Sequence, residues 1–255
     1  MKPALGGCGV AGSQWPLRAG LLAAGFGSRM RESGGGPKAL TLVAGRPLID
    51  WVLDDIEEAN VSEIVIIINE QSLAVCEHVE SRRRSCRIRW IVETTPSSMH
   101  SFLRVVEELA RRGDDGPFLV STVDTIAPPG TFRQFVEAAR HLRHADVILP
   151  LTTRMEDDKP LKVEIRRLPE VQGGEITALG GDGAYATAGY YLVRASVLRE
   201  AAACRAENLG ALRLFFQHLL DCGCRLAGIC MPDSIDVDRP ADVGAAEMVL
   251  RTENG

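Results

Sequence analysis

Short apolar runs rich in β-branched residues alternate along the chain with longer segments in which apolar residues recur every three or four positions. The first pattern is typical of buried strands and the second of amphipathic helices. Residues 63–68, with the sequence EIVIII, form the clearest strand, because a continuous apolar run is expected where both faces of a parallel sheet are covered. Residues 47–59 show helical spacing and are predicted to form the helix before it.

The same alternation continues through the first 150 residues. The predicted strands are 18–24, 63–68, 87–92, 118–123 and 147–151, and the predicted helices are 47–59, 72–82, 98–111 and 132–141. Strands that alternate with helices of this length imply crossover connections and a mostly parallel sheet. The predicted fold class is therefore α/β, with a Rossmann-like mixed sheet flanked by helices.

The rhythm changes after Pro150. Residues 162–167 and 175–179 are predicted to pair as antiparallel strands, with Gly173 and Gly174 between them. Predicted elements follow at 187–193 (strand), 209–220 (helix), 225–231 (strand) and 240–250 (helix). Residues 17–255 are expected to form one domain, and the glycine-rich residues 1–16 a loose tail.

Composition narrows the class of protein. With 45% hydrophobic and 25% charged residues, the 255-residue chain is typical of globular proteins. A net charge of -5 argues against a nucleic-acid partner, and the basic run 82–84 is expected to be a solvated helix end. No apolar run reaches the ~20 residues of a membrane span, so no membrane partner is expected. The seven cysteines, with Cys222 and Cys224 lacking a second pair for zinc, indicate reduced thiols and a cytoplasmic protein.

The segment LLAAGFGSRM, residues 21–30, predicts a phosphate-binding loop. Gly25 and Gly27 permit backbone angles that turn successive N–H groups toward one anion. Arg29 and, after Pro37, Lys38 add positive charge. A glycine turn with a purely structural role is the simpler alternative.

Two other nucleotide-binding loops fit less well. A dinucleotide fingerprint needs a third glycine where Met30 stands, and an acidic residue about 20 positions on that is missing from its place. A P-loop is excluded because the chain has no Gly-Lys-Ser/Thr sequence.

The loop, the Pro-Lys pair and the sequence GRPLI at 45–49 together resemble the signature of the NTP-transferase superfamily. This group contains the sugar-1-phosphate nucleotidylyltransferases, the molybdenum-cofactor guanylyltransferases and several cytidylyltransferases. The resemblance covers most of the chain from residue 17 onward and is faint between about 70 and 115. It implies a GT-A-like fold and transfer of an NMP group from an NTP to a small phosphorylated acceptor, most often a sugar 1-phosphate. A homo-oligomer is compatible with the sequence.

The resemblance also implies residue roles. Lys38 would stand at the α-phosphate and Arg29 would hold the NTP phosphates. Ser98 precedes or opens a helix, where it fits either an N-cap or a nucleotide contact. The predicted nucleotide-binding set is Leu22, Ala23, Ala24, Gly25, Gly27, Ser28, Arg29, Lys38 and Ser98.

Two aspartates are candidate Mg²⁺ ligands. Asp124 follows the apolar run 118–123, and ligands of open α/β sheets bind where strands end in this way, although an aspartate there also caps turns. Asp238 lies in DSIDVDRPAD, residues 233–242, which resembles the closing motif of the superfamily, with Asp236 as the reserve ligand. Asp242 is expected to favour the first turn of the last helix. Carboxylate-held Mg²⁺ would neutralise the charge of the triphosphate.

The acceptor side is predicted from residues 185–191, where Ala188 and Gly189 would let the acceptor lie against the backbone. Lys162 would meet the acceptor phosphate, or is equally an exposed strand lysine. Two other functions stay open: a GT-A-type glycosyltransferase, whose D-x-D motif Asp236 and Asp238 mimic, and a catalytically silent nucleotide-binding module.

Overall fold

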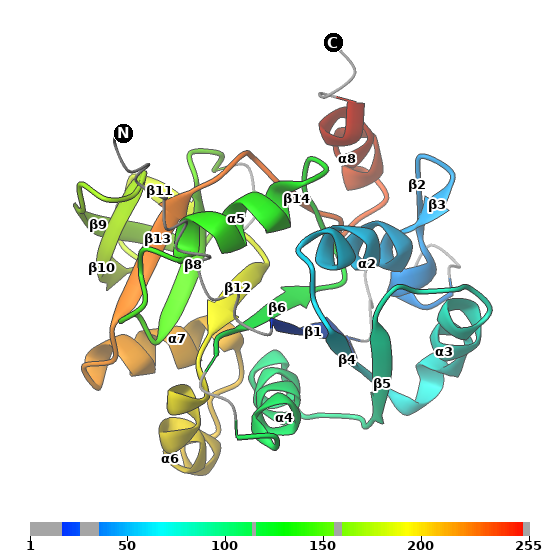
Figure 1. Ribbon diagram of the computed structural model, residues 1–255, viewed down its shortest axis with the longest axis horizontal. Coiled ribbons are helices and arrows are strands. Elements are labelled where there is room, and N and C mark those ends of the chain that lie inside the picture. The colour runs from blue at the N-terminus through cyan, green and yellow to red at the C-terminus, as the bar shows by residue number, and fades with distance from the viewer. Residues whose placement is uncertain (1–16, 26–35, 114–115, 156–159, 252–255) are drawn as a thin grey trace, which may run out of the picture.

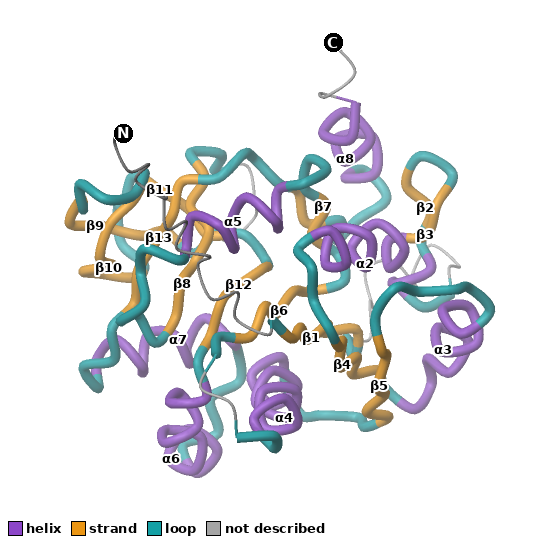
Figure 2. Tube along the Cα trace, in the orientation of Figure 1, coloured by secondary structure: helices purple, strands orange, loops and turns teal. Residues whose placement is uncertain are grey.

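A mixed sheet of ten strands forms the centre of the molecule, with helices on both faces (Figure 1; Figure 2). The computed structural model describes residues 17–25, 36–113, 116–155 and 160–251. The strand order across the sheet is β11-β9-β10-β13-β8-β12-β6-β1-β4-β5. The predicted α/β class, with a mixed sheet flanked by helices, is confirmed. The parallel pairing predicted for most of the sheet is found in its first half and between β8 and β13.

The first half of the sheet is parallel. It consists of β1 (Arg18–Ala23), β4 (Glu63–Ile68), β5 (Arg87–Val92) and β6 (Phe118–Thr122). All six residues of β4 are buried, as the apolar run predicts. Because β1 lies between β4 and β6, the carboxyl ends of three strands meet at one edge.

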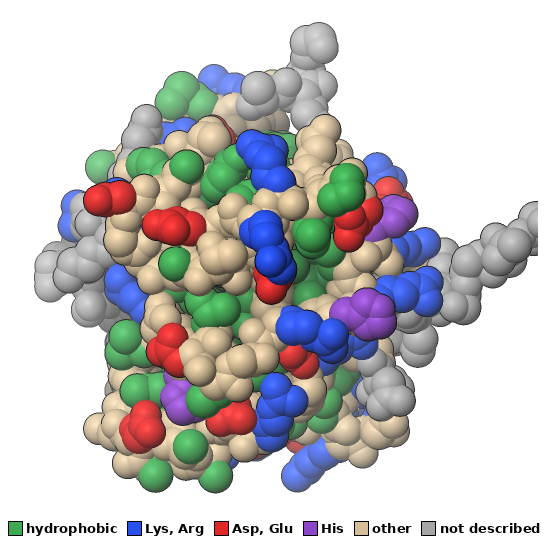
Figure 3. All heavy atoms as spheres, turned by 90° about the vertical axis from the view of Figure 1, so that its left-hand side faces the viewer, with side chains coloured by type: hydrophobic (Ala, Val, Ile, Leu, Met, Phe, Trp, Pro, Cys, Tyr) green, Lys and Arg blue, Asp and Glu red, His purple; other side chains and the backbone are tan. Residues whose placement is uncertain are grey.

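The second half is mixed. The strands β8 (Val147–Thr152) and β13 (Leu226–Cys230) are parallel, and β12 (Tyr190–Val193) runs antiparallel between β6 and β8. At the far edge lie β9 (Lys162–Arg167), β10 (Gly173–Leu179) and β11 (Tyr185–Thr187). On the side of the molecule formed by these edge strands, positive and negative side chains are interspersed (Figure 3).

The helices divide between the two faces. One face is covered by α2 (Leu48–Glu58), α3 (Leu73–Glu80) and α5 (Thr131–Ala139), and the other by α4 (Ser98–Ala110), α6 (Ala201–Ala206) and α7 (Leu212–Asp221) (Figure 1). Short 3₁₀ turns are η1 (Lys38–Leu40), η2 (Glu70–Ser72) and η3 (Ala195–Glu200). The last helix is α8 (Asp242–Arg251). No helix in the described part of the chain has the length and apolar character of a membrane span.

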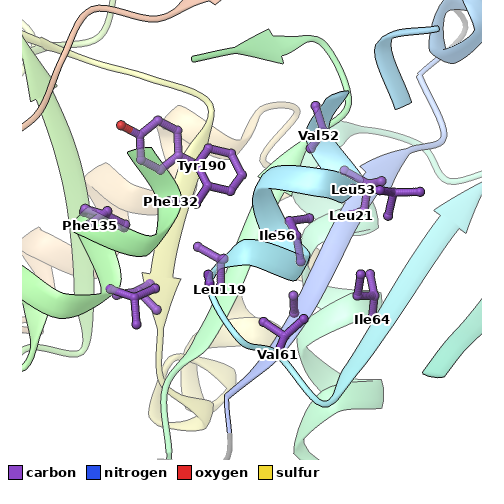
Figure 4. Packing of buried hydrophobic residues seen from close by; sticks show 14 of the residues in the cluster. Leu21, Val52, Leu53, Ile56, Val61, Ile64, Leu119, Phe132, Phe135 and Tyr190 are labelled. Atoms are coloured by element: carbon purple, nitrogen blue, oxygen red, sulfur yellow. The ribbon is translucent and has the colours of Figure 1, made fainter. Parts of the chain in front are cut away.

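The core on the α2 side combines aliphatic and aromatic side chains (Figure 4). Leu53 and Ile56 of α2 are fully buried over β1 and β4. Tyr190 of β12 packs between Phe132 and Phe135, with ring centroids 4.6 and 5.2 Å away. Burial of an aliphatic side chain such as Leu53 or Ile56 stabilises the fold by about 1.5–3 kcal/mol. These side chains therefore hold α2 firmly against the sheet.

Gly173 and Gly174 lie inside β10, not in the loop where the sequence placed them. A Cβ atom on Gly173 would stand 1.9 Å from the carbonyl oxygen of Gly228, and one on Gly174 would stand 2.2 Å from that of Arg166. The glycines are therefore needed for close backbone approach, a requirement set by the neighbouring strands rather than by a turn.

Residues 187–193 form parts of two strands and not one. The chain leaves β11 at Thr187, passes Ala188 and Gly189, and enters β12 at Tyr190. β11 pairs with β8 and β9, whereas β12 pairs with β6 and β8. The break moves the chain toward the middle of the sheet, which the local pattern did not predict. The helical segment η3–α6 was also not predicted.

The basic run 82–84 is solvated only in part. Arg82 and Arg83 are exposed, as predicted, but Arg84 is only 9% exposed at its side chain and contacts Asp50 and Asp54 at 2.9 and 2.7 Å. Asp50 lies on α2, is fully buried, and also contacts Arg82 at 2.7 Å and His78 at 3.0 Å. Arg82 and Arg84 therefore belong to an ion-pair network that joins α2 to the segment after α3.

We expect Asp50→Asn to lower the free energy of unfolding by about 3 kcal/mol, because it removes the fully buried charge partner of Arg84 and leaves only the more exposed Asp54. Urea denaturation measures the loss. The control is Glu175→Gln, which removes the partner of Arg166 in an exposed pair and should cost under about 1 kcal/mol. Equal losses in the two variants would show that the Asp50 network contributes no more than a surface pair.

Candidate active site

Lys38, Asp124 and Asp238 meet at the carboxyl edge of the sheet. The ammonium of Lys38 donates hydrogen bonds to Oδ2 of Asp124 and Oδ1 of Asp238, residues 86 and 200 positions away in sequence. The side chain of Lys38 is 11% exposed, that of Asp124 20% and that of Asp238 43%. Three residues singled out separately from the sequence thus form one charged group.

Backbone pairing brings the two aspartates together. Val123 donates its N–H to the carbonyl of Leu22 at 3.1 Å, which places Asp124 beside the end of β1. The carbonyl of Asp124 accepts the N–H of Val237 at 2.9 Å. Just beyond, β7 (Thr125–Ile126) pairs antiparallel with β14 (Ile235–Asp236). Asp238 therefore reaches Asp124 through a two-stranded ribbon that is separate from the main sheet.

A small apolar cluster lies next to the segments that carry Lys38, Asp124 and Asp238. It is made of Val43, Leu48, Ile126, Ile235, Val237 and Ala246. The residues come from the hairpin of β2 (Leu42–Val43) and β3 (Arg46–Pro47), from α2, from β7 and β14 and from α8. Each charged residue follows or precedes a segment anchored in this cluster, so apolar burial determines where the charges stand.

The three charges perturb one another. Burial disfavours the charged form of Lys38, but the two carboxylates outweigh burial and hold the pKa of its ammonium above the ordinary value. Burial likewise opposes ionisation of Asp124, but Lys38 and a hydrogen bond from Thr122 hold its pKa below the ordinary value. Asp124 Oδ1 is buried and has no hydrogen-bond partner among the residues that the structure describes.

A cleft of about 700 Å³ opens over the charged group. One wall is the end of β1, with Leu22, Ala23, Ala24 and Gly25, and the opposite wall is α7, with Leu212, Arg213 and Phe216. Its other lining residues include Pro37, Lys38, Ser97, Ser98, Ser101, Asp124, Leu161, Ala188, Gly189, Tyr191, Asp236 and Asp238. Small side chains along β1 leave room for a ligand against the backbone.

The predicted phosphate loop is described only in part. Gly25 lines the cleft, while Gly27, Ser28 and Arg29 lie outside the described residues. Their roles stay predictions.

Asn69 supports the start of the loop and was missed by the sequence analysis. Its Nδ2 donates to the carbonyl of Ala24 at 3.0 Å, and its Oδ1 accepts from Gln71 N at 3.0 Å and from Ser72 Oγ at 2.9 Å. Asn69 is fully buried. The available signal was its position, since a polar residue directly after the buried run 63–68 lies at the same edge as the loop.

Ser98 lies at the cleft but joins two helices. Its Oγ accepts the backbone N–H of Leu212 at 3.1 Å, so it ties the first turn of α4 to the first turn of α7. Ser97 precedes α4 without making a side-chain cap, and its Oγ lies 2.9 Å from Nδ1 of His100. A nucleotide contact of Ser98 stays a prediction.

On the acceptor side, Ala188 and Gly189 line the cleft. A Cβ on Gly189 would stand 2.1 and 2.4 Å from the hydroxyls of Thr125 and Thr122, so protein atoms occupy the space that its missing side chain leaves. Lys162 is not among the described residues that line the cleft. Its Nζ lies 3.9 Å from Oδ1 of Asp182, and the neighbouring Leu161 reaches the cleft instead.

The aspartates of the closing motif have different contacts. Asp236 Oδ1 accepts from Thr125 Oγ1 at 2.5 Å, which secures the ribbon. Asp242 Oδ2 accepts from the N–H groups of Asp238 at 2.9 Å and Arg239 at 2.6 Å. It therefore holds the turn at the start of α8 by hydrogen bonds as well as by its place in the first turn. Asp238 is the member of the motif that contacts Lys38.

A second cavity of about 240 Å³ adjoins the cleft at Thr187, Ala188, Asp236 and Asp238. Arg154 and Arg239 line it, and neither was predicted to be a site residue.

Comparisons with known proteins identify the family of the chain. Residues 19–219 match the family described as MobA-like NTP transferase domain. The chain is 32% identical over 193 residues to a CMP-5'-(3-aminopropyl)phosphonate synthase of Streptomyces rubellomurinus, across 72% of this chain and 29% of that one. It is 33% identical over 149 residues to an N-acetylmuramate alpha-1-phosphate uridylyltransferase of Caulobacter vibrioides, across 56% and 61% of the two chains. The match to the synthase spans less than a third of its length.

Solved structures share the fold. A UDP-glucose pyrophosphorylase in complex with UDP-glucose superimposes with a TM-score of 0.77 at 14% identity, over 92% of this chain and 98% of that one. The inositol-1-phosphate CTP transferase from T. maritima superimposes with a TM-score of 0.73 at 18% identity, over 95% and 99%. Because the family match extends over most of the chain, the chain belongs to the family of MobA-like NTP transferase domains, within the NTP-transferase superfamily that its loop and Pro-Lys motifs resemble.

Proposed function

We propose that the chain is a Mg²⁺-dependent nucleotidyltransferase that moves an NMP group from an NTP onto a phosphorus-bound oxygen of a small acceptor and releases pyrophosphate. One observation carries the proposal: Lys38, Asp124 and Asp238 converge at the floor of a cleft large enough for a nucleotide. Such a cleft at the carboxyl ends of parallel strands is the usual ligand site of an open α/β sheet.

The side chains present fit Mg²⁺. Asp124 and Asp238 offer carboxylate oxygens, which this hard cation prefers. The buried and unpartnered Oδ1 of Asp124 is an oxygen that a cation would satisfy. The ammonium of Lys38 already stands between the two carboxylates, so the site accepts positive charge. When bound, Mg²⁺ neutralises charge on the oxygens around the reacting phosphorus.

The protein's own part is to position reactants and offset charge. An acceptor phosphate or phosphonate carries an ionised oxygen at neutral pH, and that oxygen forms the new bond to the α-phosphorus. The bond from the α-phosphorus to the bridging oxygen breaks, and pyrophosphate leaves with the electron pair. No general base is needed, which fits a site made of one lysine and two carboxylates. Lys38 would stabilise the charge that spreads over the α-phosphate oxygens.

The acceptor that we propose first is a sugar 1-phosphate. A phosphonate is the second candidate, because the Streptomyces rubellomurinus synthase, whose name specifies an aminopropylphosphonate, aligns over 72% of this chain. Both acceptors present the same nucleophile. A glycosyltransferase is less well supported, because the two aspartates of the D-x-D-like sequence have different contacts. Asp236 contacts Thr125, whereas Asp238 contacts Lys38.

Pyrophosphate release tests the proposal. The purified protein is incubated with CTP, UTP, GTP, ATP or dTTP, each paired with sugar 1-phosphates or with 3-aminopropylphosphonate. We expect one NTP to react in the presence of Mg²⁺, with an NMP–acceptor product visible by mass spectrometry. Chelation with EDTA should abolish the reaction and excess Mg²⁺ should restore it, because the triphosphate charge is otherwise not neutralised.

The failing outcomes are distinct. Turnover of a nucleotide sugar without pyrophosphate release would identify a glycosyltransferase. Saturable NTP binding without turnover, across the whole acceptor panel, would identify a silent nucleotide-binding module.

A further inference from the structure

Glu200, His218 and Cys222 form a compact group of side chains at the end of α7, on elements that carry none of the three charged residues of the cleft. Their ligand atoms all lie within 4.8 Å of one another. Oε2 of Glu200 is 3.3 Å from Nε2 of His218, and Sγ of Cys222 is 3.4 Å from the same nitrogen. His218 is in α7 and Cys222 follows its last residue, so their four-residue spacing places both on one face.

The two distances to Nε2 of His218 match the edges of a tetrahedral metal site. Zinc binds imidazole nitrogen at about 2.0–2.1 Å, thiolate at about 2.3 Å and carboxylate at about 2.0–2.2 Å, which holds neighbouring ligand atoms roughly 3.4–3.6 Å apart. We propose that Glu200, His218 and Cys222 bind a zinc-type transition metal ion, with water in the fourth position.

A catalytic Cys-His-Glu arrangement does not explain the geometry. In such a triad the carboxylate and the thiol contact opposite ring nitrogens, so that one orients the imidazole and the other loses its proton. Here Glu200 and Cys222 share Nε2 of His218. The carboxylate near Nδ1, that of Glu207, is 3.9 Å away, beyond hydrogen-bond distance, so it does not orient the ring as a triad requires. Convergence of three ligand atoms on one point is what a metal ion requires.

The other ring nitrogen lies near a carboxylate, without a hydrogen bond to it. Oε2 of Glu207 lies 3.9 Å from Nδ1 of His218. A metal-bound histidine usually directs its second nitrogen to a carboxylate, which fixes the ring orientation. His218 and Glu200 are 17% and 22% exposed and Cys222 is exposed, so an ion has access from solvent.

The ligand set separates this ion from the Mg²⁺ of the proposed reaction. Thiolate and imidazole select zinc and related transition metals, whereas Mg²⁺ prefers oxygen. No zinc site was expected from the sequence, because Cys222 and Cys224 lack a second cysteine pair. The folded chain supplies histidine and glutamate in its place.

Binding would stabilise one wall of the cleft. The ion would join the end of η3 to the end of α7 and so enclose residues 200–222, including α6. The first turns of α7 line the cleft through Leu212, Arg213 and Phe216. The expected role is therefore structural, and it does not depend on whether the proposed transfer reaction is correct.

Metal titration of the whole chain tests the site. After chelation and desalting, Zn²⁺ is titrated by calorimetry, and Co²⁺ is added to reveal a thiolate charge-transfer band in the absorption spectrum. We expect one tight equivalent per chain and the cobalt–thiolate band. Zn²⁺ at 100 times its dissociation constant should raise Tm by roughly 5 °C or more.

Variants make the test specific. Cys222→Ser and, separately, His218→Gln should weaken Zn²⁺ binding by about 10²-fold or more, because each removes a direct ligand. The matched control is Cys86→Ser, since Cys86 Sγ also lies near a carboxylate, 3.5 Å from Glu57 Oε1, but the cysteine belongs to no such group among the described residues. Asp124→Asn should also leave Zn²⁺ binding unchanged. Absence of a tight equivalent in the wild-type protein, or equal affinity in Cys222→Ser and Cys86→Ser, would overturn the proposal.

Discussion

Asp124→Asn is expected to lower turnover about 10³-fold, since a loss of several kcal/mol in transition-state stabilisation corresponds to this factor. The substitution keeps the size of the side chain but removes a charge from the group formed with Lys38 and Asp238. The buried Oδ1 of Asp124 would be replaced by a neutral amide group, which binds a cation more weakly than a carboxylate. Initial rates across a Mg²⁺ titration measure both the loss and the weaker metal dependence.

Asp238→Asn is expected to behave similarly, and the double variant should be little worse than either single one. Residues that act as one unit give non-additive effects, because the first substitution already disables the site. Asp236→Asn is the internal control, since its carboxylate is hydrogen-bonded to Thr125 and its loss should be milder. Circular dichroism and Tm verify that each variant is folded.

The outcomes separate the residue assignment from the mechanism. An active Asp238→Asn enzyme beside an inactive Asp236→Asn enzyme would exchange the two aspartates of the closing motif. Full activity of Asp124→Asn would refute the proposed carboxylate-held metal.

Lys38→Ala is expected to lower turnover by about 10²–10³-fold, because a charge that offsets the α-phosphate is removed. The structure adds a second expectation. The Lys38 ammonium occupies the space between the carboxylates that would hold Mg²⁺, so in the nucleotide-free protein the two cations compete. Without Lys38, divalent cations should bind the free protein more tightly, and Tm should fall without metal and recover with it.

Mn²⁺ titration of the nucleotide-free protein, followed by calorimetry or electron paramagnetic resonance, measures this competition. Lys162→Ala is the matched control, because Lys162 stands near Asp182 at 3.9 Å and does not line the cleft. Weaker Mn²⁺ binding in Lys38→Ala than in wild type would show that the lysine and the metal do not compete. A raised KM for the acceptor in Lys162→Ala alone would support the acceptor role that the superfamily resemblance implies.

Local pattern was sufficient for much of the fold. The run 63–68 is buried along its whole length, and the helix predicted at 47–59 is observed as α2. These elements could be predicted because strand burial and helical amphipathicity repeat over a few residues of the same segment. The phosphate-loop motif and the Pro-Lys pair likewise indicated the superfamily, because the residues of each motif lie within a few positions of one another in the sequence.

Other features depend on partners that are distant in sequence. Gly173 and Gly174 read as a turn, yet the backbones of Gly228 and Arg166 demand them inside a strand. Arg84 reads as a surface charge, yet it is only 9% exposed and pairs with Asp50 of α2. In each case the neighbour that decides the role is many positions away, so the local sequence contains no trace of it.

For the candidate active site, the sequence indicated the residues and the fold determined their arrangement. Lys38, Asp124 and Asp238 were each recognisable from the residues around them, because each lies in a short motif. Their meeting through a single ammonium was decided by the β7–β14 ribbon and the apolar cluster beneath it. Glu200, His218 and Cys222 had no such motif at all, and only folding brought their ligand atoms within 4.8 Å. The type of each residue determines which reaction or ligand it can serve. Which of these residues lie next to one another depends on how the apolar side chains of the whole chain are buried, and this is decided only when the chain folds.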